Sequence, residues 1–240
     1  MKSFSQYYQD KAIDFALNRK RDGIFLDIGA HDGVSLSNTI FFERSRNWTG
    51  LCIEPIPEVF ARLRSNRHCS VSNCCILDGE KEVTFRNVSP PLEMLSGILE
   101  FFDQKHIDRI NAEVSMIADG QGYQDIMIPG HNINRLLERQ GLYEIDYCSI
   151  DTEGAEVNIV KSIDFNRIKV RAFSIENNDT TGELRNYLSS FGYARYSLGS
   201  DDVYIKGKYS WTLAKYVEYL NAKIELRSKI VALHQKYIRR

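Results

Sequence analysis

Two acidic side chains flank a glycine turn near the start of the chain. Residues 26–33 read LDIGAHDG, so Asp27 and Asp32 stand on either side of Gly29, and Gly33 follows. Glycine lets the backbone approach a ligand without a Cβ in the way. Carboxylates beside such a turn would repel the pyrophosphate of a dinucleotide, but they suit a ligand that carries an ammonium and a sulfonium group. The turn therefore favours S-adenosylmethionine over NAD.

Another carboxylate, Glu54, ends the next apolar run, about 20 residues beyond the turn. Ligands of open α/β sheets bind at the carboxyl ends of the strands, where an acid on the second strand can accept hydrogen bonds from a ribose diol. The glycines do not follow the G-x-G-x-x-G spacing, which also argues against a dinucleotide. The structural alternative is that Asp32 only caps the turn and that Asp27 makes an internal hydrogen bond.

Oxygen-bearing side chains also follow two later apolar runs. Asp151 comes directly after residues 145–150, and Glu176 and Asn177 come after residues 170–175. Because neighbouring parallel strands end at the same edge of a sheet, we expect these side chains to lie close together. Carboxylate and amide oxygens suit Mg²⁺ or Ca²⁺ rather than zinc. The sequence therefore offers Asp151, Glu176 and Asn177 as candidate metal ligands, and a cation there would lower the pKa of a substrate hydroxyl.

A metal-free alternative gives the same residues another role. Asp151, Glu176 or His31 would then act as the general base that removes the hydroxyl proton. Glu153 and Glu156 follow Asp151 closely, and acids in the first turn of a helix stabilise its dipole. For Glu156 this structural role is the favoured interpretation, whereas function is favoured for Asp151 and Glu176.

The elements that carry these residues alternate between strands and helices along residues 1–208. Continuous apolar runs are typical of parallel strands that are buried on both faces. The last two strands lie too close in the sequence for a crossover helix, which predicts an antiparallel hairpin at the sheet edge. We therefore predict a doubly wound α/β fold with a mostly parallel sheet. The expected strands are residues 23–28, 50–54, 69–76, 145–150, 170–175, an edge strand at 82–85 and the hairpin at 191–193 and 203–205, with helices at 39–43 and 58–63.

Residues 88–124 interrupt this alternation. The segment holds Pro90, Pro91 and three glycines, and one helix is expected within it at 101–117. An insertion of this length in a compact domain is more often a lid or a substrate loop than a simple connection. We therefore expect it to face the substrate.

The charge is divided unevenly between the body and the C-terminal tail. The chain of 240 residues holds 31 Lys and Arg against 32 Asp and Glu, which gives a net charge of -1. From Lys206 onward there are nine basic and two acidic residues, so the tail carries +7 and the remainder −8. The basic excess typical of nucleic-acid-binding proteins is absent from the chain as a whole, so nucleic acid is not an expected partner.

Residues 209–240 are predicted to form one basic amphipathic helix. Such a helix packs on its own domain, pairs with a second protomer or lies on an anionic surface. We expect a homo-oligomer or docking through this helix first, and membrane-surface contact second. The apolar positions are Leu213, Val217, Leu220 and Ile224, spaced by four, three and four residues, and a second set at Leu226, Ile230, Leu233 and Tyr237.

The cysteines and the absence of targeting segments indicate the cytoplasm. Five cysteines, an odd number without a CxxC motif, favour buried free thiols in a reducing compartment. The N-terminus lacks the apolar core of a signal peptide, and no apolar stretch approaches the roughly 20 residues of a transmembrane segment. We therefore expect a cytoplasmic protein.

These motifs resemble those of the FkbM family of S-adenosylmethionine-dependent methyltransferases. The matching pieces follow one another in the same order across residues 3–205, which makes the resemblance specific. They are SQ at 5–6, QD at 9–10, LDIGAHDG at 26–33, SNT at 37–39, FE at 42–43, WTGLCIEP at 48–55, IDYCSIDTEGAE at 145–156, IENN at 175–178 and GY at 192–193.

The resemblance implies a class I methyltransferase fold, Rossmann-like with a seven-stranded sheet and followed here by the C-terminal helix. It also implies O-methylation of a hydroxyl on a sugar, in a glycan or a nucleotide sugar, or on a related natural product. Gln9, Asp10 and the insertion would face the acceptor. The set Asp151, Glu176 and Asn177 resembles the divalent-metal site of catechol-type O-methyltransferases. The implied cofactor residues are Gly29, Ala30, His31, Asp32 and Gly33 for the methionine part, Glu54 for the ribose, Cys74 and Cys75 beside the adenine, and Asp27, Ser37, Asn38 and Asp151 around them.

Two other functions stay open at this point. An NAD-dependent oxidoreductase would use the same fold, although the acids beside Gly29 argue against it. A non-catalytic scaffold would act through the C-terminal helix, although an intact set of carboxylates at the strand ends argues against a degenerate domain.

Overall fold

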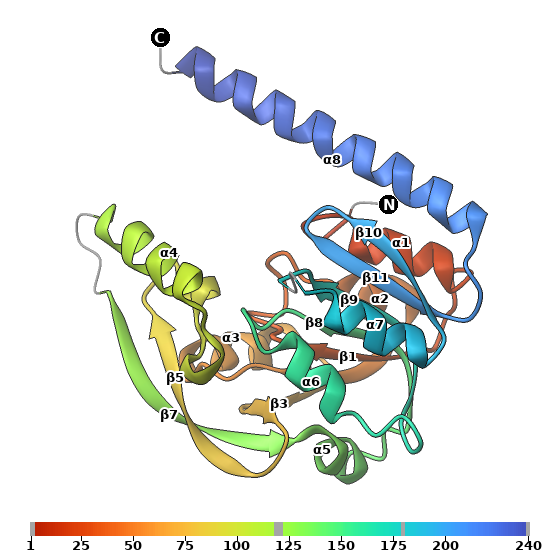
Figure 1. Cartoon of the computed structure of the whole chain (residues 1–240), viewed down its shortest axis with the longest axis horizontal. Helices are drawn as coiled ribbons and strands as arrows, with labels where there is room; N and C mark the ends of the chain where they lie inside the picture. The colour runs from red at the N-terminus through yellow and green to blue at the C-terminus, as the bar shows by residue number, and fades with distance from the viewer. Residues whose placement is uncertain (1–2, 118–121, 179–180, 239–240) are drawn as a thin grey trace.

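A seven-stranded sheet runs through the centre of the protein (Figure 1). The computed structural model describes residues 3–117, 122–178 and 181–238, with side chains to residue 232. The strands of this sheet are β1 (Ile24–Ile28), β2 (Thr49–Ile53), β3 (Ser70–Ser72), β8 (Glu144–Ile150), β9 (Lys169–Glu176), β10 (Tyr193–Leu198) and β11 (Asp201–Lys206). Their order is β10-β11-β9-β8-β1-β2-β3, and only β11 runs antiparallel to its neighbours. The predicted doubly wound α/β sheet with an antiparallel edge hairpin is confirmed.

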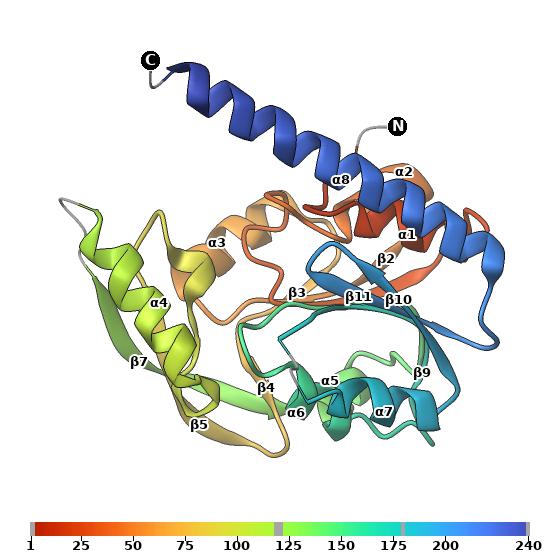
Figure 2. The same cartoon turned by 45° about the horizontal axis from the view of Figure 1, so that its top comes forward.

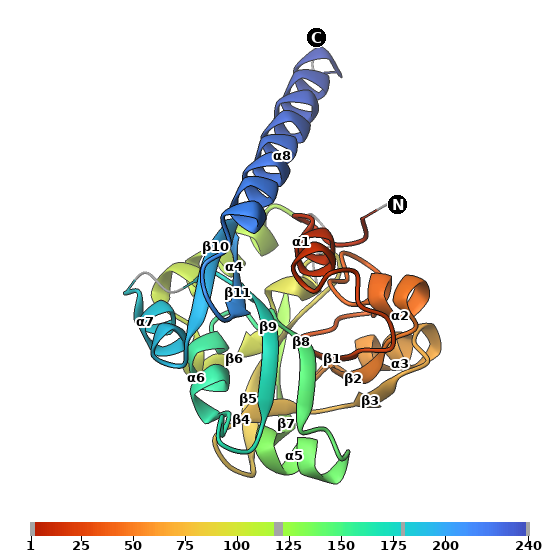
Figure 3. The ribbon, with the colours of Figure 1, turned by 90° about the vertical axis from the view of Figure 1, so that its right-hand side faces the viewer.

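Helices cover both faces of this sheet (Figure 3). One face carries α1 (Gln9–Ala16), α2 (Ile40–Arg46), α3 (Pro57–Asn66) and the start of α8 (Trp211–Ile238), and the other carries α5 (Ile133–Arg139), α6 (Glu156–Ser162) and α7 (Glu183–Ser190). Successive strand residues alternate between the two cores, so Phe25 packs on the first face and Leu26 on the second. Because both faces are covered, the strands read as continuous apolar runs.

The prediction of one strand at residues 69–76 is wrong. The structure divides this stretch into β3 and β4 (Cys75–Leu77), which belong to different sheets. Asn73 lies at the break, and its Nδ2 donates hydrogen bonds to the carbonyl oxygens of Glu54 and Pro55, each at 2.8 Å. These bonds from a side chain to the backbone tie the break to the end of β2 and stabilise the change of direction.

A second sheet of four strands is a feature that the sequence did not predict. β5 (Lys81–Val88) pairs along its whole length with β7 (Tyr123–Asn132), and β4 and the short β6 (Gly97–Ile98) complete the order β4-β7-β5-β6. The expectation of an edge strand at 82–85 is therefore wrong, because β5 is bonded on both sides. Figure 1 shows β5 and β7 as a long curved arm beside the central sheet.

Much of the insertion belongs to this arm. The predicted helix at 101–117 is present as α4 (Gln104–Ser115), and residues 118–121 lie outside the described part of the chain. Asp103 caps the helix by accepting a 2.7 Å hydrogen bond from the His106 backbone N–H. Ile110 packs against Val88 and Leu95, which holds α4 on the arm.

The long C-terminal helix α8 is also confirmed. Leu213, Val217 and Leu220 are buried in the core on the side of α1 and β10. From residue 225 to residue 232 every side chain is exposed, and Figure 2 shows this end of the helix leaving the body. The side chains of Leu233 and Tyr237 lie outside the described residues. Within the described part of the chain, no helix has the length and apolar character that crossing a bilayer requires.

Candidate active site

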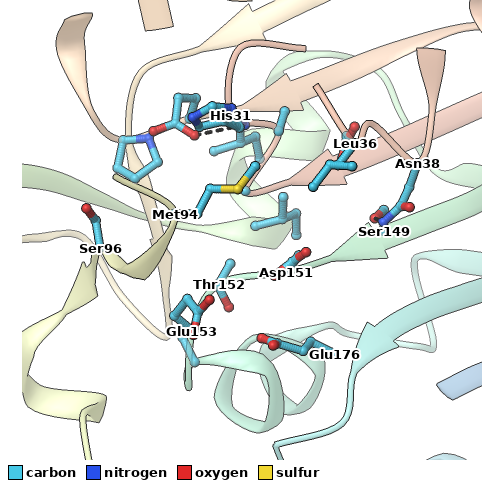
Figure 4. A pocket seen from close by; sticks show the side chains of 18 of the residues that line it. His31, Leu36, Asn38, Met94, Ser96, Ser149, Asp151, Thr152, Glu153 and Glu176 are labelled. Carbon is cyan, nitrogen blue, oxygen red and sulfur yellow. Dashed lines mark hydrogen bonds between the residues drawn. The ribbon is translucent and has the colours of Figure 1, made fainter. Parts of the chain in front are cut away.

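A cavity of about 470 Å³ opens at the carboxyl ends of β1, β2, β8 and β9 (Figure 4). This is the edge at which open α/β sheets bind their ligands, and the volume lies in the usual range for small-molecule sites. The N-terminal segment, the β10–β11 turn and the insertion add the remaining walls. Segments from across the chain therefore meet around one site.

The glycine turn after β1 forms part of the wall. Gly29 has φ +84°, and the N–H groups of Gly29 and Ala30 both donate to the Ile53 carbonyl at 3.0 Å. A Cβ on Gly29 would lie 1.8 Å from the backbone oxygen of Asp151. Glycine is therefore required here both by the backbone conformation and by the close approach of β8.

The two aspartates of the turn make structural hydrogen bonds. Asp27 is buried beside the cavity, where its carboxylate accepts from the Thr39 hydroxyl at 2.6 Å and lies 4.0 Å from the Arg67 guanidinium. Burial raises the pKa of Asp27. Asp32 accepts from the backbone N–H groups of Val34 and Ser35 and does not line the cavity. Asp32 therefore caps the turn, as the structural alternative expected.

Glu54 holds the turn from the end of β2 and still borders the cavity. Its two carboxylate oxygens accept from the backbone N–H groups of His31 at 3.0 Å and Ile56 at 2.8 Å. Burial raises the pKa of Glu54 to about 7. A carboxylate has about four acceptor positions, so two remain for a ligand hydroxyl.

Asn38 carries an unsatisfied acceptor at the cavity wall. Its side chain is 8% exposed, and its Nδ2 donates to the Ser149 hydroxyl at 3.0 Å. Its Oδ1 has no hydrogen-bond partner in the described part of the chain. A buried acceptor without a partner is costly, so this oxygen fits a donor group on a ligand. The neighbouring Ser37 hydroxyl accepts from the Ile40 backbone N–H at the start of α2.

Cys74 and Cys75 form an uncharged wall of the same cavity. Both side chains are buried, and burial raises the pKa of both thiols. Of the predicted cofactor residues, Asp32 and Gly33 do not line the cavity, whereas the others do. Those that do are Asp27, Gly29, Ala30, His31, Ser37, Asn38, Glu54, Cys74, Cys75 and Asp151.

Three carboxylates form a cluster in the same cavity. Oxygens of Asp151, Glu153 and Glu176 lie within 4.8 Å of one another, at the ends of β8 and β9 (Figure 4). Glu153 joins the cluster because its backbone turns back at φ +53°. Asn177 is exposed, donates its backbone N–H to the Ser200 carbonyl and does not line the cavity. The structure therefore brings Glu153, and not Asn177, to the pair Asp151 and Glu176.

Like charges and a poorly hydrated setting shift the pKa values of this cluster. Loss of water raises the pKa of Asp151 well above its ordinary value, and the charge of Glu176 raises it further. The same two causes raise the pKa of Glu153 to about 8. Burial and the charge of Glu156 raise the pKa of Glu176 to about 7. The cluster therefore holds protons more tightly than isolated carboxylates do.

Glu156 lies in the first turn of α6, where its charge suits the helix dipole as expected, and it also holds the preceding turn. It is buried, and its carboxylate accepts from the Thr152 backbone N–H at 3.0 Å and from the Gly154 backbone N–H at 3.1 Å. These bonds fix the turn that presents Asp151 and Glu153.

The insertion brings basic side chains to the cluster, which the sequence analysis missed. His106 Nδ1 lies 3.5 Å from Glu153 Oε2, and Arg109, one turn further along α4, lines the cavity. The charge of Arg109 offsets part of the rise that burial and neighbouring carboxylates cause in the pKa values of Glu153 and Glu176. The i, i+3 spacing of two basic residues within the predicted helix is the signal that could have identified this face.

The N-terminal segment forms another wall of the cavity. Gln9 is buried, and its Nε2 donates at 2.6 Å to Asp201, a cavity residue of the β10–β11 turn that the sequence analysis also missed. Asp10 is fully buried and accepts from the hydroxyls of Ser3 and Ser5. Gln9 therefore faces the cavity, whereas Asp10 holds the segment together.

His31 lines the cavity without a hydrogen bond to its ring. Its Nε2 lies 3.7 Å from Glu93 and its Nδ1 lies 3.8 Å from Asp32, and neither nitrogen has a hydrogen-bond partner in the described chain. The ring is therefore available to a ligand.

Comparison with known proteins identifies the family. The Methyltransferase FkbM domain model matches residues 27–194. Among solved structures, the chain is similar to the METTL16 MTase domain, with 13% identity and a TM-score of 0.45 over 84% of this chain and 66% of that one. It is also similar to methyltransferase FkbM from Methylobacillus flagellatus KT, with 15% identity and a TM-score of 0.42 over 77% of this chain and 43% of that one.

A third similar structure is precorrin-6y C5,15-methyltransferase from Geobacter metallireducens GS-15, with 12% identity and a TM-score of 0.40 over 86% of this chain and 92% of that one. The chain thus spans just under two thirds of the METTL16 domain and less than half of the Methylobacillus protein. No curated protein sequence matches it significantly. The domain match covers most of the chain and includes the glycine turn, Glu54 and the carboxylates after β8 and β9. The family implies S-adenosylmethionine as the methyl donor. The chain therefore belongs to the FkbM family of methyltransferases.

Proposed function

We propose that the protein is an S-adenosylmethionine-dependent O-methyltransferase that acts on a hydroxyl of a sugar, in a glycan or a nucleotide sugar, or of a related natural product. The observation that carries this proposal is the carboxylate cluster of Asp151, Glu153 and Glu176 in the same cavity as the glycine turn. A hydroxyl is a poor nucleophile at neutral pH, and carboxylates with raised pKa values are suited to take its proton.

The residues around the turn fit the methyl donor. S-adenosylmethionine supplies an electrophilic methyl group, so the protein must align it with the acceptor. Asn38 Oδ1, which lacks a partner in the described chain, would accept from the donor's ammonium group. Glu54 has acceptor positions left for the ribose hydroxyls, and the uncharged surface of Cys74 and Cys75 suits the adenine ring.

The fit of Asn38 gives a direct test. Asn38→Ala should raise the dissociation constant of S-adenosylhomocysteine about tenfold or more, because a hydrogen bond to a charged group is lost. Isothermal titration calorimetry measures this, and Asn158→Ala, an exposed asparagine of α6, is the matched control. Unchanged affinity in Asn38→Ala would contradict the assignment.

Glu54 predicts a pH dependence of cofactor binding. Only the ionised carboxylate accepts at all its positions, and its pKa of about 7 means that ionisation rises from roughly a tenth at pH 6 to nine tenths at pH 8. The affinity for S-adenosylhomocysteine should therefore increase about tenfold over this range. Calorimetry at several pH values should find a flat profile for Glu54→Gln, whereas an equally steep profile would assign the effect to another group.

The acceptor proton would leave through the cluster. Glu176, with a pKa of about 7, and Asp151 line the cavity as candidate general bases, and the unbonded ring of His31 is the third. Arg109 of the insertion, which lines the same cavity beside the cluster, would contact the acceptor.

The same cluster also fits Mg²⁺. Three carboxylates with oxygens within 4.8 Å, whose pKa values are raised by burial and by mutual repulsion, form a hard donor set whose repulsion a cation would relieve. Bound there, Mg²⁺ would supply Lewis acidity toward the acceptor hydroxyl. Treatment with EDTA separates the two routes: a rate restored by Mg²⁺ supports the metal, and an unchanged rate supports the general base.

The reaction itself is tested by turnover. Sugars and nucleotide sugars incubated with S-adenosylmethionine should yield S-adenosylhomocysteine and a product heavier by one methylene, as measured by mass spectrometry. Tight binding of NADH without binding of S-adenosylhomocysteine would overturn the proposal in favour of an oxidoreductase. We also propose a cytoplasmic location, which the five free cysteines support.

A further inference from the structure

The side of α8 that turns away from the body carries large apolar side chains. Tyr219, Leu226 and Ile230 are spaced by seven and four residues, which places them on one face of the helix, and they are 52–59% exposed. Trp211 at the start of the helix is 75% exposed. The buried residues Leu213, Val217 and Leu220, with Asn221, occupy the opposite side, where Asn221 bonds to the β10–β11 hairpin.

Basic side chains border this apolar row on both sides. Lys215 and Lys223 lie one turn before and one turn after Tyr219, Arg227 lies one turn before Ile230, and Lys229 lies one turn after Leu226. All four side chains are exposed. We call these seven residues the outer face of α8: Tyr219, Leu226, Ile230, Lys215, Lys223, Arg227 and Lys229.

The two acidic residues of the helix border this face on the side of Lys229. Glu218 precedes Tyr219 and Glu225 precedes Leu226 by one residue, the same offset of about 100° at which Lys229 precedes Ile230. The tail as a whole carries +7 and the rest of the chain −8. The charged residues nearest the apolar row are therefore Lys215 and Lys223, one on each side of it, in a tail of net positive charge.

The C-terminal end of α8, which carries part of the outer face, packs against no other described part of the chain. All side chains from residue 225 to residue 232 are exposed, and Figures 1 and 2 show this end standing clear of the other elements. These residues extend a helix whose first turns are packed on the body, so its exposed end is held by backbone hydrogen bonds without tertiary packing. A surface that covers the apolar row would stabilise this end.

We propose that the outer face of α8 lies on an anionic lipid surface. Tyr219, Leu226 and Ile230 would enter the boundary between headgroups and acyl chains, while the flanking Lys and Arg side chains extend to the phosphates. A symmetric pair formed by two copies of this face is disfavoured, because a two-fold interface sets the basic patch of one copy against the basic patch of the other. The proposal is independent of the methyl acceptor.

Vesicle co-sedimentation of the full chain tests the proposal. The protein should pellet with vesicles that contain phosphatidylglycerol and not with pure phosphatidylcholine, and about 0.5 M salt should release it. Lys223→Gln together with Arg227→Gln should weaken binding about 25-fold, since each basic residue near the surface contributes about fivefold.

A second pair of variants tests the apolar row. Leu226→Asn with Ile230→Asn should reduce binding more than tenfold, and both positions are exposed, so the fold and the affinity for S-adenosylhomocysteine should not change. The matched control is Met116→Asn with Met127→Asn, two exposed methionines on other elements, which should bind like the wild type.

Three outcomes would overturn the proposal. They are equal binding to neutral and anionic vesicles, absence of binding to both, and sedimentation of the vesicle-free protein as a dimer that the Leu226 and Ile230 changes convert to a monomer. The last outcome would assign the outer face to a second copy of the chain. None of them bears on methyl transfer, so the two proposals fail separately.

Discussion

Replacing Asp151 by Asn is expected to lower kcat by about 10²- to 10⁴-fold, the usual contribution of a group that moves a proton. The side chain is exposed to the cavity at the end of β8, and no hydrogen bond to its carboxylate is found among the described residues. Asparagine keeps the shape but can neither take a proton nor offer a charged oxygen to a metal. The loss is therefore expected whether the cluster works as a base or as a metal site.

The measurement separates chemistry from binding. Steady-state turnover should collapse, while calorimetry should find the dissociation constant of S-adenosylhomocysteine changed by less than the rate. Asp108→Asn, on the exposed side of α4 and outside the cavity, is the matched control and should keep full activity. Wild-type turnover in Asp151→Asn would remove Asp151 from the reaction and would leave Glu176 or His31 as the base.

The central sheet could be predicted because burial on both faces leaves a clear mark in the sequence. The runs that form β1, β8 and β9 are rich in apolar residues and largely buried, and those of β8 and β9 lead to carboxylates that the fold places on one edge. The candidate catalytic and ligand-binding side chains lie at the ends of these strands. Asp151 and Glu176 could therefore be assigned to one site from the sequence alone.

The four-stranded arm could not be predicted in the same way. Its pairing joins Lys81 of β5 to Gly130 of β7, so the register depends on residues far apart in the chain. β7 also contains Pro129 directly before Gly130, two residues that usually indicate a turn. Only the presence of a partner strand identifies this segment as a strand.

The composition of the carboxylate cluster shows a similar limit. Glu153 and Asn177 both stand next to a strand end, and the sequence favoured Asn177 as a ligand. Glu153 has a left-handed backbone, and the Glu156 carboxylate stabilises this turn by accepting from the backbone N–H groups of Thr152 and Gly154. The Glu153 side chain lines the cavity. The local backbone conformation thus brings Glu153 into the cluster, and residue type and spacing alone do not reveal that conformation.

Gly29→Ala adds a single methyl group to the cofactor wall, the side of the cavity formed by the glycine turn, and we expect no other added methyl group on this wall to be more damaging. The new Cβ would lie 1.8 Å from the Asp151 backbone oxygen, and backbone at this position cannot shift as a flexible side chain can. The ends of β1 and β8 would have to separate, which would break the 3.0 Å hydrogen bond from the Asp151 N–H to the Ile28 carbonyl. We expect a loss of roughly 3–5 kcal/mol in the free energy of unfolding and no measurable binding of S-adenosylhomocysteine.

The chain offers a control that separates the collision from the strain of the backbone. Gly141 has φ +67°, close to that of Gly29, but a Cβ there would meet nothing within 4 Å. Gly141→Ala should therefore show only the left-handed strain, about 1–2 kcal/mol. Thermal unfolding should place Gly29→Ala several degrees below Gly141→Ala, because each kcal/mol corresponds to about 2–4 °C in a protein of this size. Equal melting temperatures would mean that the end of β8 moves away from the new Cβ without loss of stability. The cofactor wall would then not depend on contact between the ends of β1 and β8.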